Sequence, residues 1–199
     1  NWPDVNFYIS VDGRKDTHDA IRGKGCHDKI KKHANRPDLK IHVSMVINKM
    51  NYQDIECFIE EWKDVGVKGC LFQMYTPIKG LKNDDLWPGW KLRDEILDKL
   101  LRLKDEKYGD FIGVPSLVLK LMKSDKCKEV TRNCIFREVS FCLDPQGQLK
   151  KPCMMGPQAD CLRCGCMLPF HMRVLEDKWL MARELFTSLR RKIGKKALQ

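Results

Sequence analysis

Residues 39–75 read LKIHVSMVINKMNYQDIECFIEEWKDVGVKGCLFQMY. The stretch opens with a largely apolar, β-branched run to Ile47, which predicts a buried strand. Apolar side chains then recur at helical spacing between residues 54 and 65. Gly66 is a residue that ends helices, and the apolar run that follows it to Tyr75 predicts another strand. The stretch therefore predicts one strand–helix–strand unit.

The residues before this unit extend the same pattern. Residues 5–11 (VNFYISV) predict a strand that ends at Asp12-Gly13, a turn signal. Residues 17–34 predict a helix that is interrupted at Gly23 and Gly25. Strands and helices that alternate at this spacing imply right-handed crossovers, so we expect an α/β fold with a parallel sheet. Ligands of such sheets lie beyond the carboxyl ends of the strands. Those ends are residues 10–13, 48–51 and 73–77.

The remaining chain is predicted to contain a loop, two helices, a hairpin with two arms and a last amphipathic helix. These elements cover residues 76–89, 90–106, 116–122, 136–141 with 148–151, and 171–193. The hairpin turn is Asp144-Pro145-Gln146-Gly147, which has the residues that a type I turn favours. Trp87 and Trp90 lie near the presumed ligand face, where they either contact a substrate or pack as ordinary hydrophobic residues.

Charge and hydropathy exclude some classes of protein. The net charge is +10, from 37 basic and 27 acidic residues. The charges are spread along the chain except for a basic run over residues 190–196, which we interpret as a solvated helix end. We therefore expect no nucleic-acid partner. No run of 18 apolar residues occurs, so we expect no membrane-spanning segment.

The ten cysteines are unevenly placed, and seven of them fall within residues 127–166. A secreted, disulfide-linked scaffold is shorter and poorer in lysine-rich helices. The distribution therefore favours a cytoplasmic protein with a metal or cluster site.

The clearest chemical signal is the run Cys142-x10-Cys153-x7-Cys161-x2-Cys164-x-Cys166. A hairpin flanked by cysteines, followed by a tight Cys-x2-Cys loop, directs several soft thiolates to one point. Scattered buried cysteines would not cluster in this way. Structural zinc usually has two Cys-x2-Cys pairs, and this chain has one. An iron–sulfur cluster tolerates irregular spacing, and we favour it. The extra cysteines, Cys127, Cys134 and Cys166, are either spare ligands or ligands of a second cluster.

At this point a resemblance becomes visible. Ser10-Val11-Asp12-Gly13, His18-Asp19 and Ile21-Arg22-Gly23-Lys24-Gly25 resemble the fourth strand and following helix of radical SAM barrels. The cysteine-rich segment is similar to the SPASM or Twitch extension of those enzymes, which holds an auxiliary 4Fe–4S cluster. The resemblance covers nearly the whole chain.

The resemblance implies an α/β fold that is the second half of a parallel (β/α) barrel, followed by a cysteine-rich hairpin segment and a terminal helix. The corresponding parts are residues 1–122, 123–171 and 172–199. It also implies that S-adenosylmethionine is bound by Ser10, Asp12, Arg22 and Asn48, with Arg22 paired to its carboxylate. The parent reaction is hydrogen abstraction by a 5′-deoxyadenosyl radical, with flavodoxin or ferredoxin as the electron donor.

One departure limits this expectation. The Cys-x3-Cys-x2-Cys loop that defines the family, and that binds the cluster which cleaves S-adenosylmethionine, is absent from the sequence. The chain also begins without methionine, so we expect a fragment or half of a split enzyme that is inactive alone. The second 4Fe–4S cluster would require the missing half. Half a barrel also leaves open sheet edges. The alternative is a non-catalytic zinc or iron–sulfur module that contacts nucleic acid.

Overall fold

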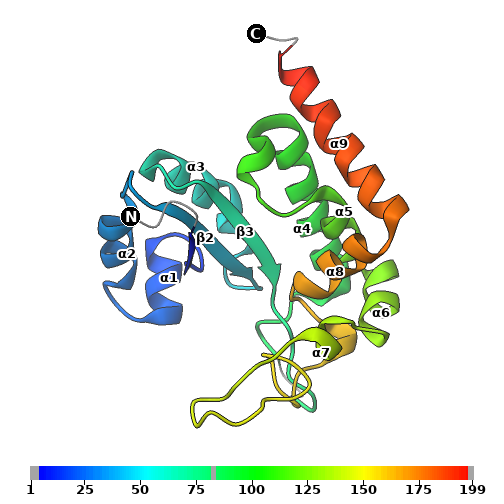
Figure 1. Cartoon of the computed structure of the whole chain (residues 1–199). Helices are drawn as coiled ribbons and strands as arrows, with labels where there is room; N and C mark the ends of the chain where they lie inside the picture. Colours follow the sequence, from blue (N-terminus) through cyan, green and yellow to red (C-terminus); the bar gives the residue numbers. More distant parts are fainter. Residues whose placement is uncertain (1–4, 82–83, 197–199) are drawn as a thin grey trace.

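The computed structural model describes residues 5–81 and 84–196, the side chains of the last six excepted (Figure 1). Three parallel strands form one sheet in the order β1-β2-β3. They are β1 (Asn6–Ser10), β2 (Lys40–Ile47) and β3 (Gly69–Met74). In the register of the sheet, Ser10 lies opposite Ser44, and Met45 lies opposite Phe72. The predicted parallel sheet is therefore confirmed.

Helices connect the strands as the sequence predicts. The first crossover contains α1 (Lys15–Arg22) and α2 (Cys26–Ala34), and the second contains α3 (Ile55–Val65) after a short 3-10 turn (Tyr52–Asp54). The break between α1 and α2 lies at two glycines with positive φ, Gly23 and Gly25. Every second residue of β2 from Ile41 to Ile47 is buried, together with the apolar face of α3. One face of the sheet therefore carries the core.

The rest of the described chain is mainly helical. Its longer helices are α4 (Gly89–Leu103), α5 (Ser116–Leu121), α6 (Ser124–Arg132), α8 (Leu168–Glu176) and α9 (Lys178–Lys196). Its shorter elements are a π-helical turn (Lys104–Tyr108), a 3-10 turn (Gly109–Phe111), α7 (Phe136–Val139) and the 3-10 turn η4 (Cys161–Arg163). In Figure 1, α4, α5, α6 and α8 lie together on the far side of β3 from β1.

Two predictions in this part are wrong. Residues 136–141 are not a hairpin arm, because residues 136–139 form helix α7. The hairpin is smaller than predicted, with one bridge between Leu143 and Leu149, although its turn is confirmed by a hydrogen bond from Gly147 N to Asp144 O (3.0 Å). The predicted helix over residues 171–193 is divided between α8 and α9. The break is at Asp177, which has extended backbone and whose carboxylate accepts the backbone N–H groups of the first turn of α9.

The two edges of the sheet differ. The outer edge of β3 is partly covered by an isolated bridge between Cys70 and Ile112, with a hydrogen bond from Gly113 N to Cys70 O (2.8 Å). No strand within residues 5–81 and 84–196 pairs with the outer edge of β1. Among the described helices, none combines the length and the apolar character needed to cross a bilayer. The basic side chains after Arg190 lie outside the described part.

Candidate metal centre

Five cysteines line one small cavity, which we call the cysteine cavity. They are Cys134, Cys153, Cys161, Cys164 and Cys166, and they come from three segments of chain. Cys134 lies between α6 and α7, Cys153 follows the hairpin, and the other three belong to the η4 loop that leads into α8. The folded chain therefore gathers thiols that are up to 32 residues apart in sequence, from Cys134 to Cys166.

The thiols line the cavity, but they are not arranged around one common point. The free volume between them is about 20 Å³, close to the room that one water molecule needs. No group of three or more His, Cys, Asp or Glu side chains in the described part is already arranged around a single metal position. A multi-iron cluster therefore requires these thiols to move outward. The side chains of Met154, Met155 and Leu162 on these loops are exposed to solvent.

Burial favours the protonated form of three thiols that line the cavity, those of Cys134, Cys164 and Cys166. Burial raises the pKa of Cys164 to about 12 and that of Cys166 to about 11. Burial also raises the pKa of Cys134, and the neighbouring sulfurs of Cys153 and Cys161 act in the same direction. Because a metal binds the thiolate, loading of this cavity must displace protons from the sulfurs.

The cysteine cavity is attached to the carboxyl end of the sheet through Gly165. Met74 N, in β3, donates to Gly165 O (2.9 Å), and Gly165 N donates to Thr76 Oγ1 (2.8 Å). A Cβ atom at Gly165 would lie 1.8 Å from Met74 O, so only glycine permits this approach. A second contact joins Ile78 to Ala159, and Figure 1 shows the loop after β3 beside the cysteine-rich loop. The cavity therefore lies near the strand ends at which parallel sheets bind ligands.

The structure brings four of the five predicted cysteine ligands together and places the fifth elsewhere. Cys153, Cys161, Cys164 and Cys166 line the cysteine cavity, whereas Cys142 does not. Cys142 lies in the hairpin, where its carbonyl accepts Lys150 N (2.7 Å). Cys134 lines the cavity instead. The sequence left Cys134 as a spare ligand, because we expected both cysteines that flank the hairpin, Cys142 included, to face the Cys-x2-Cys loop.

The predicted residues at the strand ends form a connected network. Asp12 is buried, and its Oδ2 accepts Arg22 Nε (2.6 Å) while its Oδ1 accepts Val46 N (3.2 Å). Arg22 thus binds a carboxylate of the protein itself. Its Nη groups make no further hydrogen bond to the described residues. Asn51 Nδ2 donates to the carbonyls of Asp12 (3.3 Å) and Val46 (3.0 Å). The network fixes the ends of β1 and β2 side by side.

The other two predicted contacts to S-adenosylmethionine differ in exposure. Ser10 is exposed at the end of β1. Asn48 is buried, with its backbone N–H donating to Asn51 Oδ1 (2.8 Å) and its own Oδ1 accepting Met50 N (2.8 Å). Asn48 therefore shapes the loop after β2, and Ser10 is free to meet a ligand.

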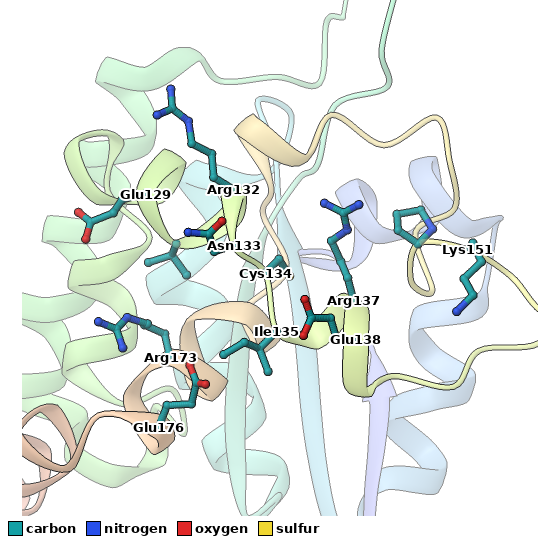
Figure 2. Close-up of a pocket in the computed structure, with 12 residues that line it drawn as sticks. Glu129, Arg132, Asn133, Cys134, Ile135, Arg137, Glu138, Lys151, Arg173 and Glu176 are labelled. Atoms are coloured by element: carbon teal, nitrogen blue, oxygen red, sulfur yellow. The ribbon is translucent and has the colours of Figure 1, made fainter.

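A larger polar pocket of about 850 Å³ adjoins the cysteine cavity, and the two share Cys134 and Arg137 (Figure 2). Figure 2 shows charged side chains of both signs around it, contributed by α6, α7, α8 and the segment at Lys151. The four basic residues are Arg132, Arg137, Lys151 and Arg173, and the three acidic residues are Glu129, Glu138 and Glu176. The pocket gives solvent access to the Cys134 side of the cavity.

Comparison of the chain with protein-family models, with curated proteins and with solved structures finds no significant match. The resemblance to radical SAM enzymes therefore stays a prediction from the sequence motifs.

Proposed function

We propose that this chain binds an iron–sulfur cluster in the cysteine cavity as part of a radical SAM enzyme. The observation that carries the proposal is the cavity itself, in which five thiols from three segments face one space. Thiolates are the ligands that iron–sulfur clusters take, and such clusters accept irregular spacing in sequence. Four of Cys134, Cys153, Cys161, Cys164 and Cys166 would hold the cluster, whose chemistry when bound is to bind substrate or accept an electron.

The radical SAM part of the proposal is supported by the position of the cavity. It lies against the end of β3, on the side of the parallel sheet where Asp12, Arg22 and Asn48 lie after β1 and β2. Ser10 and the Nη groups of Arg22 are the groups available to a ligand there. In this proposal the sheet belongs to a partial (β/α) barrel, and a segment with the Cys-x3-Cys-x2-Cys motif, which this sequence lacks, joins it. Flavodoxin or ferredoxin would supply the electron.

One observation favours a second candidate, a structural zinc site. The free volume of about 20 Å³ in the cysteine cavity suits a single ion better than a cluster. Zinc needs four sulfurs about 2.3 Å from one centre, and the described side chains do not form such a group. We favour the cluster because five thiols spread around a space match a larger cofactor.

Metal and sulfide analysis distinguishes the two. The chain is reconstituted anaerobically with iron and sulfide, and iron, sulfide, zinc and the absorption spectrum are measured. We expect about four iron and four sulfide per chain. Cys153→Ser should lose most of both, whereas Cys142→Ser, which changes a cysteine outside the cavity, should keep them. Zinc without sulfide in the wild-type chain would overturn the proposal in favour of the zinc site.

A further inference from the structure

Helix α9 is attached to the rest of the protein through its polar side. It packs on α5 and α8, and the Glu184 carboxylate accepts the backbone N–H groups of Ser116 (3.2 Å) and Leu117 (2.8 Å) at the start of α5. Leu180, one turn earlier, is partly buried against the core. These contacts fix which side of the helix faces the protein and which side faces outward.

The outward side of α9 is apolar. Each helical residue turns by about 100°, so residues 182 and 184 lie on opposite sides, and residues spaced by three and four share a side. The outward residues are exposed, and we call them the apolar surface of α9: Trp179, Ala182, Leu185, Phe186 and Leu189. A helix of a globular domain normally turns such a surface toward the core. In the described structure α9 has the reverse orientation, which indicates an external partner.

Basic residues border the apolar surface of α9. Glu184 is the one acidic residue in the sequence of α9, and its carboxylate is bound to α5. Arg183 and Arg190 are exposed, and the guanidinium carbon of Arg190 lies 4.6 Å from the centre of the Phe186 ring. Four more basic residues follow within residues 191–196 of the sequence. The chemistry that complements this surface is therefore apolar and negatively charged.

We propose that α9 docks on the surface of a membrane that contains anionic lipids. Tryptophan, phenylalanine and leucine on one face, with arginine and lysine beside them, are typical of helices that lie in the interfacial layer of a bilayer. Acyl chains cover the apolar surface of α9, and anionic headgroups pair with Arg183 and Arg190. None of the described helices can cross a bilayer, so α9 lies on the membrane and does not span it. This role does not depend on the cofactor proposed above.

Two observations favour a lipid surface over other anionic partners. A nucleic acid offers phosphates but no apolar area that would cover a row of exposed apolar side chains. A bilayer contacts one face of a helix, and α9 has one face to offer, because Glu184 and Leu180 hold the other against the protein. In Figure 1, α9 forms the outer edge of the helical part, with α5 and α8 on its inner side, so a flat surface can reach it.

Vesicle flotation of the full chain tests the proposal. Vesicles of phosphatidylcholine alone are compared with vesicles that also contain about 30% phosphatidylserine. We expect the wild-type chain to float with the second set and not with the first, and added salt to release it. Phe186→Ser should weaken binding at least about tenfold, because it removes a side chain that enters the lipid. Phe141→Ser, which changes an exposed phenylalanine outside α9, should bind as wild type does.

A second pair of variants tests the charges. Arg183→Gln combined with Arg190→Gln should weaken binding at least about tenfold, because each basic residue near an anionic surface contributes to the attraction. Lys91→Gln combined with Arg102→Gln removes the same charge from exposed positions of α4 and should have little effect. Urea unfolding of each variant checks that the fold is retained.

The remaining outcomes contradict the proposal. A wild-type chain that floats with neither set does not bind membranes, and the apolar surface of α9 then meets a second copy or an acidic protein. Equal binding to both sets means that anionic lipid is not recognised. If Phe186→Ser and Phe141→Ser weaken binding alike, α9 is not the part of the chain that contacts the membrane.

Discussion

At the scale of single residues, Asp12 illustrates what a sequence conveys and what it omits. The turn signal Asp12-Gly13 correctly predicts the end of β1. The partners of the carboxylate, Arg22 and Val46, lie 10 and 34 residues away and depend on how the crossover packs. The same limit applies to Cys134, because the helical turn that moves it toward the cavity depends on local packing around α7.

His18 provides a prediction at this scale. Asp12 N donates to His18 Nδ1 (3.0 Å), so the neutral ring carries its proton at Nε2, a buried atom without a partner in the described structure. Burial lowers the pKa of His18 below 6.5, and the neighbouring His27 ring lowers it further. The unfolded chain therefore binds more protons than the folded chain as the pH falls below about 6.5. The free energy of unfolding decreases as the pH falls through the folded pKa of His18, and the loss is complete below it.

In His18→Gln, the side-chain carbonyl can still accept from Asp12 N but cannot titrate. We therefore expect the decrease between pH 7.5 and 5.5 in urea unfolding experiments to be smaller in this variant than in wild type. His33→Gln, which changes an exposed histidine of α2, serves as the control and should follow the wild-type profile. Parallel profiles for wild type and His18→Gln would show that burial of His18 does not control the acid sensitivity.

At the scale of elements, predictions succeed where periodicity and ending residues agree. Helix α3 has apolar residues at helical spacing and Gly66 at its end, and it forms where predicted. Residues 136–141 (FREVSF) contain the aromatic and β-branched residues that strands favour, yet residues 136–139 form the short helix α7 between α6 and the hairpin. The break between α8 and α9 lies at Asp177, whose carboxylate caps the first turn of α9. The helical spacing of apolar residues continues across this position, so the spacing alone does not reveal the break.

The attachment of the cysteine-rich loop to β3 gives a prediction for one element. Gly165→Ala would place a Cβ 1.8 Å from Met74 O, so the loop must leave the strand and lose its hydrogen bonds to Met74 and Thr76. Each bond contributes about 1 kcal/mol, and with the steric term we expect a loss of roughly 2–4 kcal/mol in urea unfolding.

The matched control is Gly25→Ala, since Gly25 has φ +80° and a Cβ added there would meet nothing within 4 Å. Only backbone strain acts there, and it costs about 1–2 kcal/mol. Iron uptake should also decrease in Gly165→Ala, because three of the five thiols belong to the displaced loop. If Gly25→Ala were the more destabilising of the two, contact between Gly165 and β3 would not hold the loop in place.

At the scale of the whole molecule, the sheet is asymmetric. The edge of β3 is covered near Ile112, whereas β1 is open on its outer edge within the described residues, and the side chains of Phe7 and Tyr8 are 37% and 57% exposed. The sequence predicts open edges from the number of strands alone, but it does not predict which of the two is covered. An additional apolar surface lies on α9, where Trp179 is 83% exposed.

We expect two copies of the isolated chain to associate through β1, because an unpaired edge offers backbone donors and acceptors that another edge satisfies. Light scattering over a concentration series should give a mass above that of one chain. Tyr8→Lys should restore a single chain, since a lysine on an edge strand opposes pairing. Phe186→Lys on α9, where Phe186 is 58% exposed, should leave association unchanged. The opposite result would assign the contact to the apolar surface of α9. A single chain at every concentration in wild type would mean that the open edge of β1 does not drive association.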